Sequence, residues 1–320
     1  MTPRIVVTRA IPGSALVLLK QAGDVWVSEV DRPLDVGELH EAVAGASGVV
    51  TLLHDRVDDA FLDAAGADLR VVANVAVGYD NIDVDACVRR GVSATNTPGV
   101  LTDATADLAF ALILMATRRL GEGERLVRTG VKWRWGLDYH LGTGIQGKTL
   151  GIVGLGQIGT AVARRARAFG MDVAYAARRQ APRDLVAELG ARYLPLDELL
   201  AASDVVSLHC PLTAETQHLI DSRRLRLMRP TAFLINTTRG PVVDEAALVE
   251  ALRERALAGA GLDVFEHEPD VHPGLLELEN VVLLPHLGSA TVETRTAMAE
   301  LAARNVVAVL GGRPALTPIG

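Results

Sequence analysis

A glycine-rich turn in the middle of this chain constrains its fold more than any other feature. Residues 150–153 are apolar, Gly154–Gly159 has the spacing G-x-G-x-x-G, and residues 160–169 have the pattern of a helix. In such a turn the first glycine permits a sharp bend, the second lets backbone approach a pyrophosphate, and the third lets helix and strand pack closely. A glycine turn that binds nothing is the alternative. We expect a dinucleotide to contact Gly154, Leu155, Gly156, Gln157, Ile158 and Gly159.

Strand-like and helix-like segments alternate along the whole chain. Strand candidates are residues 5–8, 48–53, 69–75, 92–95, 149–153, 172–175, 204–209, 232–236, 260–264 and 281–284. Long helical patterns cover residues 103–120 and 289–310, whereas residues 121–147 look irregular. Alternation of this kind predicts an α/β fold of doubly wound parallel sheets, and 320 residues favour two domains. We expect a Rossmann nucleotide-binding domain and a flavodoxin-like substrate domain.

The strand after the glycine turn indicates which dinucleotide binds. An NAD enzyme usually has an acidic residue about twenty positions beyond the motif, where it accepts hydrogen bonds from the ribose 2′-OH. Here Ala177 occupies that region, and Arg178 and Arg179 follow it. An arginine at this place binds a 2′-phosphate. The sequence therefore favours NADP(H), with NAD(H) still possible and two solvated arginines as the alternative.

Composition excludes several classes of function. A net charge of −7 argues against a nucleic-acid partner, although a few local arginines are enough for a small anion. Cys87 and Cys210 have no metal-type spacing and suggest a reducing compartment. The longest apolar run, residues 108–116, is too short to cross a bilayer, and residues 4–13 do not read as a signal peptide. We expect a cytoplasmic protein with no metal and no membrane partner.

Three later segments carry candidate catalytic residues. They read Leu-Ile-Asn-Thr-Thr-Arg-Gly at 234–240, Gly-Leu-Asp-Val-Phe-Glu-His-Glu-Pro at 261–269, and Pro-His-Leu-Gly-Ser at 285–289. In order and spacing they resemble the D-isomer-specific 2-hydroxyacid dehydrogenases. The resemblance covers essentially the whole chain, including residues 77–83, 95–98, 105–107 and 209–213.

The resemblance implies a role for each polar residue of these segments. His286 would be the general acid and base, because the pKa of histidine lies near working pH. Glu268 would hydrogen-bond the other imidazole nitrogen, and Arg239 would bind the substrate carboxylate through its planar fork. Each residue alone has a simpler explanation: a structural histidine, a solvated acid or a helix-end cation. Together, at the ends of successive strands, they favour catalysis.

The resemblance also implies further contacts and a division of the chain. Residues 1–99 with 289–320 would form the substrate domain, residues 100–288 the nucleotide domain, and the active site would lie between them. The nucleotide domain would form a homodimer, with residues 121–147 reaching the partner. Additional cofactor contacts are expected from Thr105, Arg178, Arg179, His209, Cys210, Pro211, Thr216, Thr237, Thr238, Arg239, Asp263, His286 and Gly288. Substrate contacts are expected from Leu53, Val77, Gly78, Arg239, His286 and Ser289, with Val77 and Gly78 using backbone N–H groups.

Within the family, residues 95–110 and 141–152 are most similar to the glyoxylate and hydroxypyruvate reductases, so we expect a small 2-oxo or 2-hydroxy monocarboxylic acid as substrate. A phosphite dehydrogenase is the alternative, but that branch has a lysine where this chain has Val77. A 3-phosphoglycerate dehydrogenase often carries an added regulatory domain, which we do not expect here. The same Arg–Glu–His set also occurs in the dinucleotide-sensing C-terminal binding proteins, which act as corepressors; efficient turnover would distinguish an enzyme from these.

Overall fold

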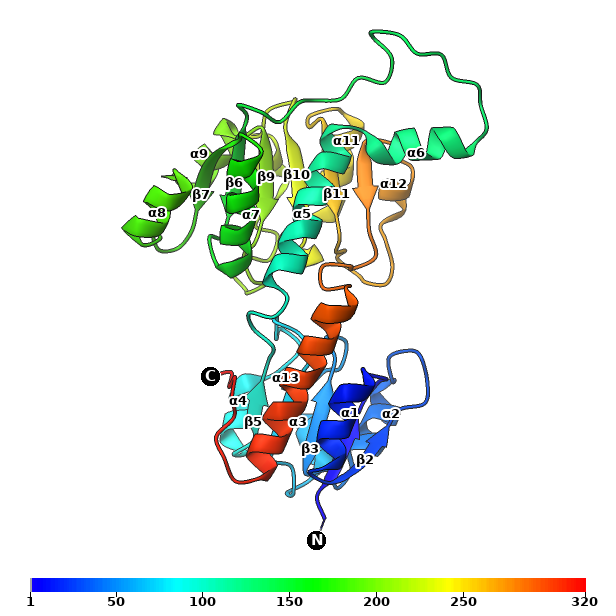
Figure 1. The fold of residues 1–320 in the computed structure, drawn as a ribbon, viewed down its shortest axis with the longest axis vertical. Coiled ribbons are helices and arrows are strands. Elements are labelled where there is room, and N and C mark those ends of the chain that lie inside the picture. Colours follow the sequence, from blue (N-terminus) through cyan, green and yellow to red (C-terminus); the bar gives the residue numbers. More distant parts are fainter. Residues whose placement is uncertain (1) are drawn as a thin grey trace. The chain divides into compact units, whose positions relative to one another are not determined.

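A computed structural model describes residues 2–320, which divide into two compact units. Unit 1 comprises Met1–Leu101 and Ser289–Gly320, and unit 2 comprises Thr102–Gly288. The chain leaves the first unit, builds the second, and returns through its C-terminal helix (Figure 1).

Unit 1 is a parallel five-stranded sheet covered by helices on both faces. Its strands are β1 (Arg4–Val7), β2 (Asp24–Val27), β3 (Gly48–Thr51), β4 (Val71–Asn74) and β5 (Ser93–Thr95), in the order β2-β1-β3-β4-β5. Its helices are α1 (Gly13–Lys20), α2 (Val36–Val43), α3 (Asp59–Ala65), α4 (Val84–Arg89) and α13 (Val292–Leu310). This strand order is that of flavodoxin-like sheets.

Alternating residues of the unit 1 strands build two separate cores. Ile5 and Val7 of β1 pack in the cluster that contains Leu19 of α1 and Val306 of α13, whereas Val6 packs in the cluster of α2 and α3. Side chains of a strand alternate between its faces, so one strand serves both layers. Helix α13 follows unit 2 in sequence, yet it covers β3 and β4 and completes the first unit.

Unit 2 has a parallel seven-stranded sheet. Its strands are β6 (Thr149–Val153), β7 (Asp172–Ala176), β8 (Arg192–Tyr193), β9 (Val205–Leu208), β10 (Phe233–Asn236), β11 (Gly259–Leu262) and β12 (Val281–Leu283). The order β12-β11-β10-β9-β6-β7-β8 is the Rossmann order with one strand added at the end. These two sheets confirm the predicted fold class.

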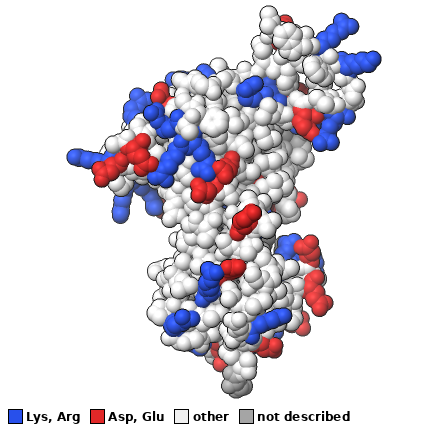
Figure 2. Space-filling model, viewed as in Figure 1, with Lys and Arg blue, Asp and Glu red and all other residues white. Residues whose placement is uncertain are grey.

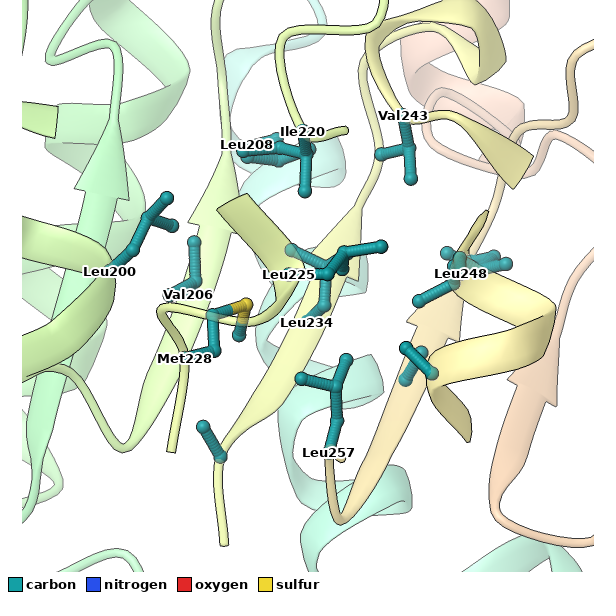
Figure 3. Close-up of a cluster of buried hydrophobic side chains, with 14 of the residues drawn as sticks. Leu200, Val206, Leu208, Ile220, Leu225, Met228, Leu234, Val243, Leu248 and Leu257 are labelled. Carbon is teal, nitrogen blue, oxygen red and sulfur yellow. The ribbon is translucent and has the colours of Figure 1, made fainter. Parts of the chain in front are cut away.

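Two helical layers cover the unit 2 sheet. One contains α5 (Thr102–Thr117), α7 (Gln157–Ala168) and α8 (Arg183–Leu189). The other contains α9 (Leu196–Ala202), α10 (Ser222–Leu225), α11 (Glu245–Arg253) and α12 (Pro273–Leu276), and its apolar core is drawn in Figure 3. There Leu234 of β10 lies among Leu225, Met228 and Leu257, so helices and strands share one buried cluster.

The sequence-based helix at 103–120 is wrong at its end. Helix α5 stops at Thr117, whose hydroxyl bonds back to the carbonyl of Ile113, and Arg119 adopts a left-handed conformation with a φ of 55°. A second helix, α6 (Leu120–Arg128), then begins inside the segment expected to be irregular. Residues 131–147 contain no helix or strand; the segment first extends away from the sheet of unit 2 and then returns to it, where Ile145 is buried (Figure 1).

Two short strands also escaped prediction, β2 and β8. Strand β2 has alternately exposed residues at an edge of its sheet, and β8 spans only Arg192 and Tyr193 at an edge of the other. Short edge strands lack the buried apolar run that marks a central parallel strand. The sequence therefore gives little signal for either.

Charges of both signs are interspersed on the face drawn in Figure 2. In unit 2, Arg165 of α7 pairs with Asp103 and Asp107 of α5, and Arg164 pairs with Glu188. Exposed pairs of this kind contribute little stability. Among residues 2–320, no helix is long and apolar enough to cross a membrane.

Candidate active site

The glycine turn lies where the ends of β6 and β9 meet. Gly154 has a φ of 98°, and a Cβ there would lie 2.7 Å from the carbonyl oxygen of His209. A Cβ at Gly159 would lie 2.2 Å from the carbonyl oxygen of Gly154, whereas one at Gly156 would meet no atom within 4 Å. The first and third glycines therefore permit close packing, and the second faces open space.

The start of α7 presents free donors to this space. Its N-cap, Gly156, has no side chain to bond the first turn, and within residues 2–320 the N–H groups of Gly156, Gln157 and Ile158 donate no hydrogen bond. Unpaired N–H groups at a helix N-terminus attract a phosphate. The turn thus has the geometry of an anion-binding site.

Two buried polar atoms of the loops after β9 and β10 also lack partners among residues 2–320. These are His209 Nδ1 and Thr237 Oγ1, although His209 Nε2 bonds the Ser207 hydroxyl at 2.8 Å. Burial lowers the pKa of His209 to about 4, so its imidazole is neutral near pH 7. Unsatisfied buried polar groups are costly, and a bound molecule can satisfy them. These residues fit a dinucleotide, which would supply the missing partners.

The segment after β10 holds Arg239 through a buried amide. Asn236 Nδ2 donates to the carbonyl of Arg239 at 2.9 Å, and Asn236 Oδ1 accepts from the Thr238 N–H at 3.0 Å. Gly240 then packs directly on the next loop, because a Cβ at this position would lie 1.9 Å from the carbonyl carbon of Phe265. This contact places the arginine segment against the loop that carries Glu268.

Glu268 and His286 form a hydrogen-bonded pair. Glu268 Oε2 lies 2.8 Å from His286 Nδ1, and Glu268 Oε1 accepts from the Phe265 N–H at 3.0 Å. Burial raises the pKa of Glu268, but the hydrogen bond and charge of His286, with Arg239 nearby, outweigh it and hold that pKa below its usual value. Within residues 2–320, His286 Nε2 has no hydrogen-bond partner, so it is available for a proton transfer.

Asp263 fixes the backbone on the other side of the histidine. It is 1% exposed, and its carboxylate accepts from Leu287 N at 2.7 Å and from Gly288 N at 2.8 Å, while its carbonyl accepts from His286 N. Burial raises the pKa of Asp263 to about 6, despite these hydrogen bonds and the nearby His286. Sequence analysis placed Asp263 among the expected cofactor contacts, and its hydrogen bonds show that it holds residues 286–288.

In unit 1, the loops after β3 and β4 carry the predicted Leu53, Val77 and Gly78. Asn81 Nδ2 ties these loops together, because it donates to the carbonyls of Leu52 at 3.2 Å and Asp55 at 2.8 Å. The buried Asn74 donates to the carbonyl of Gly78 at 3.1 Å. Sequence reasoning missed these amides, although polar residues at strand ends were the available signal.

In residues 76–78 the backbone carbonyl groups and the backbone N–H groups differ in their hydrogen bonding. The carbonyls of Ala76, Val77 and Gly78 accept from Thr97 N, Asn96 Nδ2 and Asn74 Nδ2. Within residues 2–320, the N–H groups of these same three residues donate no hydrogen bond. Consecutive free N–H groups form a concavity that binds anions.

Comparison with known proteins decides the family. The NAD-binding domain profile of the D-isomer specific 2-hydroxyacid dehydrogenases matches residues 110–288. The chain belongs to the D-isomer-specific 2-hydroxyacid dehydrogenase family. It is also similar to curated glyoxylate reductases, 49% identical over 98% of this chain and 94% of the relative in both Thermococcus onnurineus and Pyrococcus furiosus.

Solved structures agree with this assignment. The TT0316 protein from Thermus thermophilus is 47% identical and superposes with a TM-score of 0.93 over 99% of this chain and all of that one. An NADPH-dependent glyoxylate/hydroxypyruvate reductase from Sinorhizobium meliloti, solved with NADP and malonate, is 37% identical, with a TM-score of 0.84 over 100% of this chain and 97% of that one. The predicted family is confirmed, and this dehydrogenase is an oxidoreductase that uses a nicotinamide dinucleotide.

The structure sorts the predicted site residues into two sets. Leu53, Val77, Gly78 and Ser289 belong to unit 1, and Ser289 precedes the first turn of α13. The cofactor and catalytic residues belong to unit 2, where most follow strand ends and Thr105 lies in α5, its hydroxyl 3.0 Å from the carbonyl of Gly288. Those that follow strands are Gly154–Gly159, Arg178, Arg179, His209–Pro211, Thr216, Thr237–Arg239, Asp263, Glu268, His286 and Gly288.

The raised pKa of Asp263 predicts a pH-dependent cost of folding. The pKa of the Asp263 carboxyl is 3.8 in the unfolded chain and about 6 in the folded protein. The folded protein therefore binds this proton more tightly, so the group stabilises the fold at low pH. That contribution is lost as the pH rises through about 6. Between pH 5 and pH 7 the free energy of unfolding should fall by about 1 kcal/mol on account of Asp263. Urea denaturation of the wild type and of Asp263→Asn at several pH values measures this difference.

The Asp263→Asn variant should lack this part of the pH dependence, whatever constant loss of stability the amide brings. Asp24→Asn, which removes an exposed carboxylate from unit 1, is the control and should follow the wild type. Parallel curves for all three proteins would contradict the assignment.

Proposed function

We propose that this enzyme reduces a small 2-oxo monocarboxylic acid, glyoxylate or hydroxypyruvate, to the 2-hydroxy acid in a reversible reaction, and that a chiral product is the D-isomer. The observation that carries this proposal is the Glu268–His286 pair, which leaves His286 Nε2 free next to the segment of Arg239. A proton donor, a fixed carboxylate and a guanidinium are what the reduction of a 2-oxo acid requires. The glyoxylate reductases among its relatives support the choice of substrate.

Each residue has one role in this reaction. Arg239 binds the substrate carboxylate and polarises the keto oxygen, because its planar fork matches a carboxylate. The free N–H groups of Val77 and Gly78 provide further donors to the carboxylate. The nicotinamide supplies the hydride. His286 Nε2 gives its proton to the keto oxygen, and in the reverse direction takes it back, while Glu268 on Nδ1 fixes the tautomer and stabilises the imidazolium.

An assay tests the substrate and the role of His286 together. With NADPH the wild type should reduce glyoxylate or hydroxypyruvate, whereas 3-phosphohydroxypyruvate and phosphite with NADP should react poorly, because position 77 is a valine and adds no cation for a second negative charge. His286→Gln should lower kcat by roughly 10²–10⁴ because the proton donor is lost, with NADPH binding retained.

His40→Gln, which changes a histidine of α2 in unit 1, is the matched control and should retain full activity. Turnover of phosphite or 3-phosphohydroxypyruvate but of neither 2-oxo acid would reject the substrate assignment. Tight dinucleotide binding without efficient turnover of any acid would favour a corepressor-like binding protein.

We also propose that NADP(H) is the preferred cofactor. Ala177 stands where an acid would repel a 2′-phosphate, and the exposed Arg178 follows it. The guanidinium of Arg178 lies close enough to Glu215, in the loop after β9, to lower the pKa of that carboxyl, together with a larger effect from the Thr213 hydroxyl. Arg178 therefore adjoins the loop that contains Thr216, another predicted cofactor contact.

Replacement of Arg178 by alanine should lower kcat/KM for NADPH by about 10- to 100-fold, because a charge-assisted contact to phosphate is lost. The value for NADH should stay within about twofold, since the 2′-OH gains nothing from the arginine. Steady-state kinetics with both cofactors measure this, with Arg226→Ala on the surface of unit 2 as the control. Equal losses for both cofactors would contradict the proposal.

A homodimer through unit 2 is the proposed assembly. Among the exposed large apolar side chains of residues 131–141, those of Trp133, Trp135, Leu137 and Leu141 are 53%, 77%, 86% and 64% exposed. Beside this segment, a cavity of about 380 Å³ is lined by Arg119, Glu122 and residues of β12. A contiguous exposed apolar surface of this kind marks a protein interface, and a second copy of this chain is the proposed occupant.

Light scattering should give twice the 33.9 kDa of one chain for the wild type. The double variant Trp135→Asp, Leu137→Asp should give a monomer, because two carboxylates cannot be buried unpaired in an apolar interface. Leu276→Asp changes another exposed leucine, in α12 and 66% exposed, and should remain dimeric. A monomeric wild type, or a dimeric double variant, would reject this interface.

The thiols of the enzyme favour a reducing compartment, and we propose the cytoplasm. Cys87 and Cys210 are both free cysteines. Burial raises the pKa of each thiol to about 11, so neither forms a reactive thiolate near pH 7.

A further inference from the structure

The free N–H groups of the unit 1 loop owe their direction to the carbonyls of the same peptide bonds. A peptide bond is planar, and in the trans form its C=O and N–H point to opposite sides. Glu268–Pro269 is the one cis bond within residues 2–320, so the loop bonds are trans. Whatever holds the carbonyl of Val77 therefore also orients the N–H of Gly78.

Asn96 holds the carbonyl of Val77. Its side-chain Nδ2 donates to that oxygen at 2.8 Å, and the next residue, Thr97, donates its N–H to the carbonyl of Ala76 at 2.8 Å. Two neighbouring peptide planes of the loop are thus set from the segment that follows β5. A hydrogen bond to the carbonyl also polarises the peptide and strengthens its N–H as a donor.

Asn96 lies outside β5 and is itself fixed by the C-terminal segment. The Thr317 hydroxyl donates to the carbonyl of Asn96 at 2.6 Å, and the Asn96 N–H donates to the carbonyl of Thr317 at 3.3 Å. Beyond Thr317, the Ile319 N–H donates to the carbonyl of Ala94 at 2.9 Å. The last residues of the chain therefore lie along β5 like a further strand.

The C-terminal segment is in turn anchored on helix α13 by Asn305, which is fully buried. Asn305 Oδ1 accepts from Leu316 N at 2.8 Å and Thr317 N at 3.0 Å, and its Nδ2 donates to the Thr317 hydroxyl at 2.8 Å. The donors run in one direction, from Asn305 to Thr317, from Thr317 to Asn96, and from Asn96 to Val77. One continuous set of hydrogen bonds therefore joins α13 to the loop.

We propose that Asn96, held by Thr317 and Asn305, is a positioning residue for the substrate carboxylate. The C-terminal segment 316–319 sets the affinity for the acid by fixing the direction of the Gly78 N–H. This inference rests on the proposed function, since the loop binds the carboxylate there. It assigns a part in substrate binding to residues near the end of the chain, none of which touches the substrate.

Kinetics of Thr317→Val test the inference, because valine keeps the shape of threonine and removes only the hydroxyl. The KM for glyoxylate, and the inhibition constant of oxamate, a 2-oxo carboxylate analogue that accepts no hydride, should rise by about 3- to 10-fold. kcat and the KM for NADPH should stay within about twofold, because Arg239, Glu268 and His286 are unchanged. Thr317→Ser keeps the hydroxyl and should restore wild-type values.

A double-mutant cycle distinguishes positioning from general weakening. Asn96→Ala should raise the same two constants by about 10- to 100-fold, because the carbonyl of Val77 loses its donor. If Thr317 acts through Asn96, the double variant should be no worse than Asn96→Ala alone. Additive effects would overturn the inference, as would a Thr317→Val enzyme with unchanged constants.

Hydrogen–deuterium exchange provides a readout that needs no substrate. Peptides that contain the Thr97 N–H, which donates to the carbonyl of Ala76, should exchange faster in Thr317→Val and Asn96→Ala than in the wild type. Asp35→Ala, which removes the N-cap of α2 in the same unit at similar cost in stability, should not change them. Unchanged exchange at Thr97 would overturn the inference even if no acid proves to be a substrate, whereas faster exchange in an enzyme that reduces no 2-oxo acid would reject only the proposed function.

Discussion

The contact between Gly240 and the backbone of Phe265 is the one on which the catalytic set depends. With a Cβ at position 240 the two loops would overlap, because its nearest neighbour would be 1.9 Å away. Glycine lets the loop after β10 pack backbone to backbone on the loop after β11. Arg239 then lies close enough to Glu268 to lower the pKa of that carboxyl, and the Phe265 N–H holds the same carboxylate. The sheet places β10 and β11 side by side, and this contact places Arg239 near Glu268.

Both units use side-chain amides to direct backbone groups. Asn236 holds the carbonyl of Arg239 in unit 2, and Asn74 and Asn96 hold the carbonyls of Gly78 and Val77 in unit 1. A primary amide suits this purpose, since it can both donate and accept and carries no charge to desolvate. Free N–H groups at the glycine turn and at residues 76–78 remain available because the protein satisfies the other polar groups around them.

The sequence predicts those parts of the molecule that depend on interactions between residues close together in the chain. The glycine turn could be found because all three glycines lie within one strand–turn–helix unit, where Gly154 and Gly159 have no room for a Cβ. The break at Arg119 could not be found, because it depends on the left-handed backbone conformation of this residue, while the helical pattern of the sequence continues past it. The roles of Asn96 and Thr317 depend on residues more than two hundred positions apart, which no local pattern connects. The polar character of Asn96 is visible in the sequence, but its partner is not.

Glu268 and Asp263 are the two carboxylates near His286, and burial and hydrogen bonding shift their pKa values in opposite directions. Glu268 bonds the imidazole directly, and the charge of the histidine outweighs burial, so the pKa of the carboxyl falls and it stays ionised. Asp263 is buried deeper and bonds backbone N–H groups instead, so burial prevails and its pKa rises to about 6. Exchanging these environments would place the carboxyl with the higher pKa against the imidazole. In the proposed mechanism the carboxylate with the lowered pKa bonds Nδ1, where it would stabilise the imidazolium, while Asp263 holds the backbone that carries the ring.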